Sequence, residues 1–147
     1  MQESLRKILE FKKAKRPVIV GYISDQTPFW WNIHHWLTFL HHDTPVLTGA
    51  ERIVKHTDQV FVYGDMKRVK RGHYNCEFKV LREDTKRAKP FEITDEYFRR
   101  MEQSIRQQPE IYLWSHNRWK RTRAIFDEHF EYVDGKVRLQ KGKDMIW

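Results

Sequence analysis

Two short apolar runs with a helical pattern between them constrain the fold more than any other feature of the sequence. The first, VIVGYI at residues 18–23, is nearly continuous, which is typical of a strand covered on both faces. Residues 48–51 match a capping box and predict the start of a helix, and a second apolar run follows at residues 60–63. A strand, a helix and a strand in this order predict a right-handed parallel crossover. We therefore expect an α/β fold with a mixed, mostly parallel sheet flanked by helices.

The next part of the chain is expected to complete this sheet. Residues 74–80 alternate between apolar and polar side chains, which predicts a half-buried strand, antiparallel to its predecessor and near an edge. Thr94 is a suitable N-cap, and an apolar stripe of Tyr97, Phe98, Met101 and Ile105 predicts a helix that ends near residue 109. The stripe is typical of a core-facing helix.

The C-terminal residues have a different character. Beyond residue 123 the chain reads as a polar tail, in which Asp134 and Gly135 predict a small hairpin. With 147 residues the chain is long enough for one hydrophobic core. We therefore expect one domain at residues 1–123 and a polar tail at residues 124–147.

A long connector of residues 26–47 follows the first predicted strand and shows no clear strand pattern. A connection of this length in a small domain is usually a functional lid or a binding loop. Trp30, Ile33 and Trp36 would share one helical face, which suits a membrane interface or an apolar substrate groove, and equally a helix packed on its own core.

Histidine pairs in this connector raise the question of a metal. His34 and His41 are seven residues apart and would lie on the same side of a helix. However, the chain has no zinc motif of diagnostic spacing, and neutral histidines are ordinary at the edge of a loop. We expect neither a metal nor another cofactor.

The segment PEIYLWSHNRWKRTR, residues 109–123, combines apolar and cationic side chains at high density. Trp114 and Trp119 are costly to leave in water, whereas Arg118, Lys120 and Arg121 cannot be buried without partners. One side of the segment should therefore pack and the other should meet anions. The alternative is a packed helix end whose cations cap carbonyl groups.

Composition favours an anionic partner. Lys and Arg exceed Asp and Glu by 28 to 20, which gives a net charge of +8. Nucleic acid, anionic lipid and a phosphorylated substrate are all consistent with this charge. A basic, aromatic-rich nucleic-acid-binding module is thus the competing interpretation, although no nucleic-acid motif is present. The N-terminal residues lack the apolar region of a signal peptide, and no segment is apolar enough for a transmembrane helix.

Four segments, in the same order, resemble the C-terminal half of the lipid A biosynthesis acyltransferases. They are ISDQTP at 23–28, TPVLTGAERI at 44–53, YGDMKRVKRGHY at 63–74 and QPEIYLWSHNRWKRTR at 108–123. The resemblance covers nearly all of residues 1–123, and the last segment is the most specific. It implies a glycerolipid-acyltransferase-like sheet that is incomplete at the N-terminus.

The resemblance also implies an activity. Such enzymes transfer a fatty acyl group from acyl carrier protein, or another acyl thioester donor, to a hydroxyl of a phosphorylated glucosamine lipid. The reaction takes place at the cytoplasmic face of the bacterial inner membrane, so an anionic membrane surface is an expected partner and nucleic acid is not. A histidine and a carboxylate five positions later serve as general base and orienting group.

This chain departs from the family at that catalytic pair. His129 and Asp134 have the required spacing, but they follow the basic aromatic segment, and Asp134 is better explained by a turn. We therefore expect a C-terminal piece that binds the acceptor and is inactive alone, with no catalytic residue. The residues matched to acceptor binding are Asp25, Gln26, Thr48, Gly49, Arg68, Lys70, His116, Arg118 and Lys120.

Overall fold

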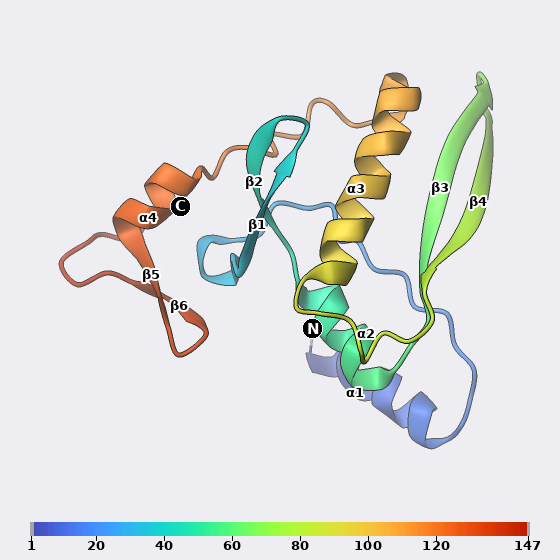
Figure 1. Cartoon of the computed structure of the whole chain (residues 1–147), viewed down its shortest axis with the longest axis horizontal. Helices are drawn as coiled ribbons and strands as arrows, with labels where there is room; N and C mark the ends of the chain where they lie inside the picture. The colour runs from blue at the N-terminus through green and yellow to red at the C-terminus, as the bar shows by residue number, and fades with distance from the viewer. Residues whose placement is uncertain (1, 147) are drawn as a thin grey trace.

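The computed structural model describes residues 2–146, which form helices and three β-hairpins (Figure 1). In chain order the elements are α1 (Gln2–Lys13), the 3-10 helix η1 (Trp30–Asn32), β1 (His35–Phe39), β2 (His42–Val46), α2 (Gly49–Thr57), β3 (Phe61–Lys70), β4 (His73–Arg82), α3 (Glu92–Gln107), the 3-10 helix η2 (Pro109–Ile111), α4 (Arg123–His129), β5 (Phe130–Val133) and β6 (Lys136–Leu139). No helix among these residues is both long and apolar enough to cross a membrane.

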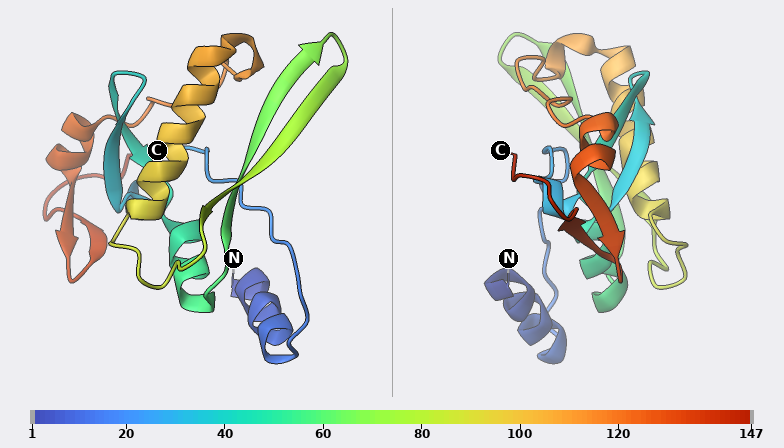
Figure 2. Two further views of the ribbon diagram at one scale, coloured as in Figure 1. Left: turned by 45° about the vertical axis from the view of Figure 1, so that its right-hand side comes forward. Right: turned by 90° about the vertical axis from the view of Figure 1, so that its left-hand side faces the viewer.

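Helix α3 occupies the middle of the molecule (Figure 1). The long β3–β4 hairpin extends along one side of it, and the β1–β2 hairpin lies on the other side (Figures 1 and 2). Helices α1 and α2 lie together near the N-terminal end of α3, where the Lys12 ammonium donates to the Thr57 carbonyl at 2.6 Å. The α4, β5 and β6 segment forms the far end of the molecule, beyond β1 and β2.

All strand pairing among residues 2–146 is antiparallel, so the predicted mostly parallel α/β sheet is wrong. Residues 18–23 form no strand, and the side chains of Ile19 and Ile23 are exposed. The strand that follows α2 pairs instead with its immediate successor, which confirms the predicted antiparallel strand at residues 74–80. The predicted half-burial of that strand is wrong, because most of its side chains are exposed. An apolar run favours burial but does not specify which strand it pairs with. A hairpin also requires less loop-closure entropy than a parallel crossover, which favours pairing between consecutive strands.

The connector of residues 26–47 contains η1 and the β1–β2 hairpin, and not the amphipathic helix considered from sequence. The hairpin turns at Leu40 and His41, which both have positive φ, at 50° and 68°. Positive φ at both central positions is the geometry of a tight hairpin turn, which normally favours Asn or Gly. A Leu-His turn carries no such signal, so the hairpin could not be recognised from sequence.

Helix α2 begins at Gly49, as the capping-box pattern predicted, but the side chains of that pattern act elsewhere. The Thr48 hydroxyl makes no capping hydrogen bond, and the buried Glu51 carboxylate accepts from the Phe91 amide at 2.7 Å. It also accepts from the amide and hydroxyl of Thr94, at 2.9 and 2.7 Å. Glu51 therefore caps the N-terminus of α3 and ties α2 to it. As a result α3 starts at Glu92, ahead of the predicted N-cap.

Most of the buried hydrophobic side chains among residues 2–146 form three small clusters. One joins the α3 stripe to the β1–β2 hairpin, and its buried members are Phe39, Val46, Phe98, Met101 and Ile105, which confirms the predicted core face of this helix. A second lies between α2, β3 and the start of α3. The third packs Trp30 and Ile33 of the connector against Phe126 and Phe130.

The C-terminal segment is held by that third cluster. Residues expected to form a polar tail carry α4 and the β5–β6 hairpin, and the predicted turn at Asp134 and Gly135 is confirmed with φ of 51° and 72°. Trp30 stacks on Phe130 with ring centroids 5.4 Å apart. The connector is therefore covered on one side by the C-terminal residues.

Candidate functional site

The connector of residues 26–47 and the basic aromatic segment of residues 109–123 pack against each other. The Trp119 indole donates to the Thr44 hydroxyl at 2.9 Å, across 75 residues of sequence. The Arg123 guanidinium pairs with Asp43, with Nη2 3.0 Å from Oδ1. These contacts place the two segments on the same side of the molecule.

Arg118 is buried within this junction. Its side chain is 2% exposed, and its guanidinium lies over the rings of Phe39 and Tyr112, with 5.5 Å to each centroid. The Nε atom donates to the Tyr112 hydroxyl, and Nη2 lies 3.8 Å from Asp25 Oδ2. A buried guanidinium requires such partners. The Arg118 guanidinium is therefore held inside the junction, and the Asp25 carboxylate near it is partly exposed.

Asp25 belongs to a loop that the basic aromatic segment holds through Thr27. The Thr27 hydroxyl donates to the Arg118 carbonyl at 3.0 Å and lies 3.3 Å from His116 Nε2. Because the hydroxyl has one proton and donates it to the carbonyl, the His116 ring must donate at Nε2. This arrangement orients the loop and leaves the His116 Nδ1 atom as an acceptor when the ring is neutral.

Tyr97 forms the inner wall of the same region. Burial, followed by the negative charge of Asp25, raises the pKa of the Tyr97 hydroxyl well above its ordinary value. The phenol therefore stays neutral and serves as a packing surface, with its ring 5.3 Å from that of Phe98.

The other predicted site residues fall into two groups. Gln26 and Lys120 are exposed next to the buried loop and segment just described. Thr48 and Gly49 lie at the start of α2, close to the loop, since Ser24 shares a small cavity with residues 47 and 50. The space beside Gly49 is open, with no atom within 4 Å of the position a Cβ would take.

Arg68 and Lys70 lie away from these residues, on the β3–β4 hairpin. The Arg68 backbone exchanges hydrogen bonds with the Gln108 amide, at 2.7 and 2.9 Å, and its guanidinium pairs with Glu110 at 3.1 Å. These bonds attach the hairpin to η2, and Lys70 is exposed at the hairpin turn. The structure thus separates the predicted acceptor-binding cations onto two surfaces.

Arg121 lies in the basic aromatic segment but is not among the predicted acceptor-binding residues. Its side chain is only 7% exposed, and its guanidinium lies over Phe29 and Trp30 at 5.2 and 5.5 Å from the ring centroids. Among residues 2–146 no carboxylate lies within ion-pair distance of it, and its Nε atom has no hydrogen-bond partner. The neighbouring Trp30 Nε1 is also unpartnered. Burial lowers the pKa of Arg121, although the guanidinium stays charged.

The buried Nε atom of Arg121 and the buried Nε1 atom of Trp30 both lack an acceptor, and the Arg121 guanidinium lies over the Trp30 ring. A buried charge without a partner is costly, and natural proteins satisfy most such groups. The exposed rings of Phe29 and Trp31 stack in parallel at 5.7 Å next to this pair. The arrangement therefore places hydrogen-bond donors next to an exposed aromatic surface. A site for an amphiphile with an anionic head group needs both features.

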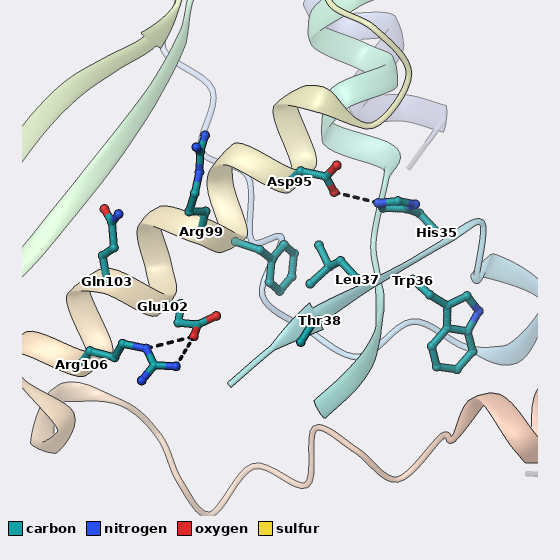
Figure 3. A pocket seen from close by; sticks show the side chains of 10 residues that line it. His35, Trp36, Leu37, Thr38, Asp95, Arg99, Glu102, Gln103 and Arg106 are labelled. Carbon is teal, nitrogen blue, oxygen red and sulfur yellow. Dashed lines mark hydrogen bonds and ion pairs between the residues drawn. The ribbon is translucent and has the colours of Figure 1, made fainter. Parts of the chain in front are cut away.

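A separate pocket of about 490 Å³ lies between β1 and α3 (Figure 3). At one end His35 Nε2 lies 2.7 Å from Asp95 Oδ1, and at the other Arg106 pairs with Glu102 (Figure 3). The His35 ring stacks on Phe91 at 4.3 Å. A histidine oriented by a carboxylate is an arrangement suited to proton transfer, but these residues are 60 apart in sequence and carry no motif.

The histidine hypotheses based on sequence find no support in the structure. Among residues 2–146 no three His, Cys, Asp or Glu side chains gather as metal ligands, and His41 contacts Arg106 at 3.1 Å. His129 Nδ1 lies 3.2 Å from the Ile125 carbonyl, and Asp134 occupies the β5–β6 turn. Their roles in helix and turn geometry account for both residues.

Comparison with known proteins adds a family assignment to this geometry. The family model described as bacterial lipid A biosynthesis acyltransferase matches residues 1–121, which include the connector, both hairpins beside α3 and the basic aromatic segment through Arg121. Searches of curated proteins and of solved structures returned no match. Because the matched region spans most of the 147 residues, the chain belongs to the bacterial lipid A biosynthesis acyltransferase family.

Proposed function

We propose that this chain binds the phosphorylated glucosamine lipid that accepts the acyl group in a lipid A acyltransferase reaction. The acyl donor in such a reaction is acyl carrier protein or another acyl thioester. The observation that carries the proposal is the buried Arg121 side chain, whose Nε atom lacks a partner, stacked on Trp30, whose Nε1 atom also lacks one. A phosphate oxygen would supply the acceptor that both donors lack.

The surroundings of Arg121 match the rest of such a ligand. Lys120 is exposed next to it and adds positive charge, while Phe29 and Trp31 present an exposed stacked surface to the acyl chains. Phe29 lies over the guanidinium and is itself largely exposed, so rotation of this one side chain would admit a phosphate. The Asp25, Thr27 and His116 contacts keep the neighbouring loop in place.

We place this binding step at the cytoplasmic face of the inner membrane, as a peripheral association, because the acceptor is a lipid. Asp25, Gln26 and His116 would contact the sugar from the loop side, and Thr48 and Gly49 at the start of α2 lie close by, with open space beside Gly49. Arg118 would act from behind, by fixing the position of Asp25.

Binding of a phosphorylated glucosamine disaccharide lipid in detergent micelles tests the proposal, with tryptophan fluorescence as the readout. We expect Arg121→Met to weaken binding at least tenfold, because loss of a buried charged partner costs about 2–5 kcal/mol. The matched control is Arg87→Met, which removes a largely exposed arginine that pairs with Asp84. The dephosphorylated lipid should bind weakly to all three proteins.

Thermal unfolding of the same variants separates binding from a structural role. Replacing an unpaired buried cation by an apolar side chain of similar length should leave the free protein equally or more stable. If Arg121→Met instead unfolds at lower temperature and binds the lipid normally, Arg121 serves only to pack the two aromatic rings. A single-stranded oligonucleotide that competes with the lipid at equal concentration would favour the nucleic-acid interpretation.

A further inference from the structure

The β3–β4 hairpin has two chemically different faces. One face packs on α3, where Asp65 accepts from Ser104 and Lys79 at 2.8 Å each. The other face carries the alternate residues of both strands, and near the end of the hairpin Arg68 of this face turns to Glu110 of η2. Its residues pair across the two strands as Val62 with Val80, Gly64 with Phe78, Met66 with Cys76, and Arg68 with Tyr74.

The outer face is apolar and uncovered. The Phe78 side chain is 76% exposed, and Val62, Met66, Tyr74 and Val80 are also exposed. None of the eight outer-face residues is acidic, because Asp65 and Glu77 lie on the face toward α3, where both pair with Lys79. An apolar patch of this extent on a folded chain marks a surface that something else covers.

The hairpin turn adds positive charge to one end of this face. Between Asp65 and Glu77 the sequence MKRVKRGHYNC contains four cations and no carboxylate. Among residues 2–146 no carboxylate lies within ion-pair distance of Lys70 or Arg71, whereas Arg68 is paired with Glu110. Val69 is exposed between these cations. The end of the hairpin is therefore cationic and its outer face is apolar.

We propose that the outer face of the β3–β4 hairpin docks on an anionic lipid bilayer. Phe78, Met66 and the valines would enter the boundary between headgroups and acyl chains, and Lys70 and Arg71 would lie at the level of the phosphates. Charge favours a bilayer over a second copy of this chain, because two chains that each carry a net charge of +8 repel each other, whereas an anionic bilayer attracts the basic turn. This inference rests on the proposed peripheral association and adds to it the surface that contacts ordinary phospholipid, which does not include Arg121.

Cys76 makes the proposal directly testable, because it is the single cysteine of the chain, is exposed, and lies in the middle of the outer face. An environment-sensitive fluorophore attached to Cys76 of the full chain should shift to the blue with vesicles of phosphatidylglycerol and phosphatidylethanolamine. The shift should be much smaller with phosphatidylcholine and should decrease as salt rises. The matched control carries the same fluorophore in Cys76→Ser with Asn75→Cys, on the opposite face, where no shift is expected.

Vesicle sedimentation of variants measures the apolar and the electrostatic contributions to binding separately. Phe78→Ser should weaken partitioning about tenfold, because it removes a large apolar side chain from the interface. Lys70→Gln combined with Arg71→Gln should weaken it about 25-fold, since each cation near an anionic surface contributes about fivefold. Met145→Ser and Lys141→Gln, exposed positions outside the hairpin, are the matched controls and should bind as the parent chain does.

Three outcomes would overturn the proposal. They are an equal shift on neutral and anionic vesicles, no shift on either, or a shift that appears without lipid as the protein concentration rises, which would identify a second copy as the occupant. The vesicles contain no glucosamine lipid, and Arg121→Met should dock on them normally. Failure of hairpin docking is therefore distinguishable from failure of acceptor binding.

Discussion

Glu51 provides the strongest test of how the fold is held together, because one buried carboxylate joins two helices. The side chain is 5% exposed and accepts three hydrogen bonds from the first turn of α3, at 2.7 to 2.9 Å. Lys55 lies 3.8 Å away and offsets part of its charge. Glu51→Ala removes the acceptor for two amides and one hydroxyl that are excluded from water.

The expected cost follows from these contacts. Hydrogen bonds to a charged group contribute about 1.5–3 kcal/mol each, and they are not additive when they share one acceptor. We expect Glu51→Ala to lower the free energy of unfolding by about 3–5 kcal/mol, a large part of the stability of a small domain. Glu51→Gln retains one oxygen but turns an NH₂ group toward a donor, so about 2 kcal/mol should be lost.

Urea unfolding followed by circular dichroism measures both variants, with Glu83→Ala as the control because Glu83 is exposed. Hydrogen exchange adds a local readout, since the amides of Phe91 and Thr94 should lose protection before the rest of α3. A loss below about 1 kcal/mol in Glu51→Ala, with those amides still protected, would refute the assignment of Glu51 as the cap of α3.

Three further predictions concern separate parts of the structure. Burial opposes ionisation of Asp65, but the hydrogen bonds from Lys79 and Ser104 outweigh it and hold the pKa of the carboxyl below its ordinary value. The stabilisation by Asp65 should therefore be complete above its unfolded-state pKa and disappear as the pH falls through its lower folded-state pKa. In urea unfolding, Asp65→Asn should lower the free energy of unfolding by about 1–2 kcal/mol at pH 7 and by clearly less near pH 3. Phe126→Ala should cost about 3–5 kcal/mol and release the β5–β6 amides to hydrogen exchange, because Phe126 is the centre of the cluster that holds them. Trp119→Phe should cost about 1 kcal/mol in thermal unfolding, because it removes the indole hydrogen bond to β2.

The elements that could be predicted from sequence are those specified by local chemistry. The α3 stripe, the start of α2, the antiparallel strand in β4 and the Asp-Gly turn of β5–β6 depend on residues close together in the chain. Each has a pattern with a direct physical cause, such as the tolerance of glycine for positive φ in a hairpin turn.

The parts that could not be predicted depend on choices between distant partners. The apolar run at residues 18–23 remained unpaired because nothing in its own sequence specifies an edge to join. Glu51 has the sequence of a local cap, yet it serves residues 40 and 43 positions away. In each case tertiary contacts decided between alternatives that local sequence left open.

The roles of the cations in the candidate site also depend on distant partners and could not be predicted from the local sequence. The basic aromatic segment predicted a surface that meets anions, but it did not show which cations are already neutralised by the protein. Arg118 and Arg123 have acidic neighbours in Asp25 and Asp43, whereas Arg121 is buried without one. Arg118 and Arg121 are both almost fully buried, so the unpaired Arg121 has more to gain from a phosphate than Arg118, which already has an acidic neighbour. The most buried unpaired cation, and not the most exposed one, is therefore where an anionic ligand would bind most strongly.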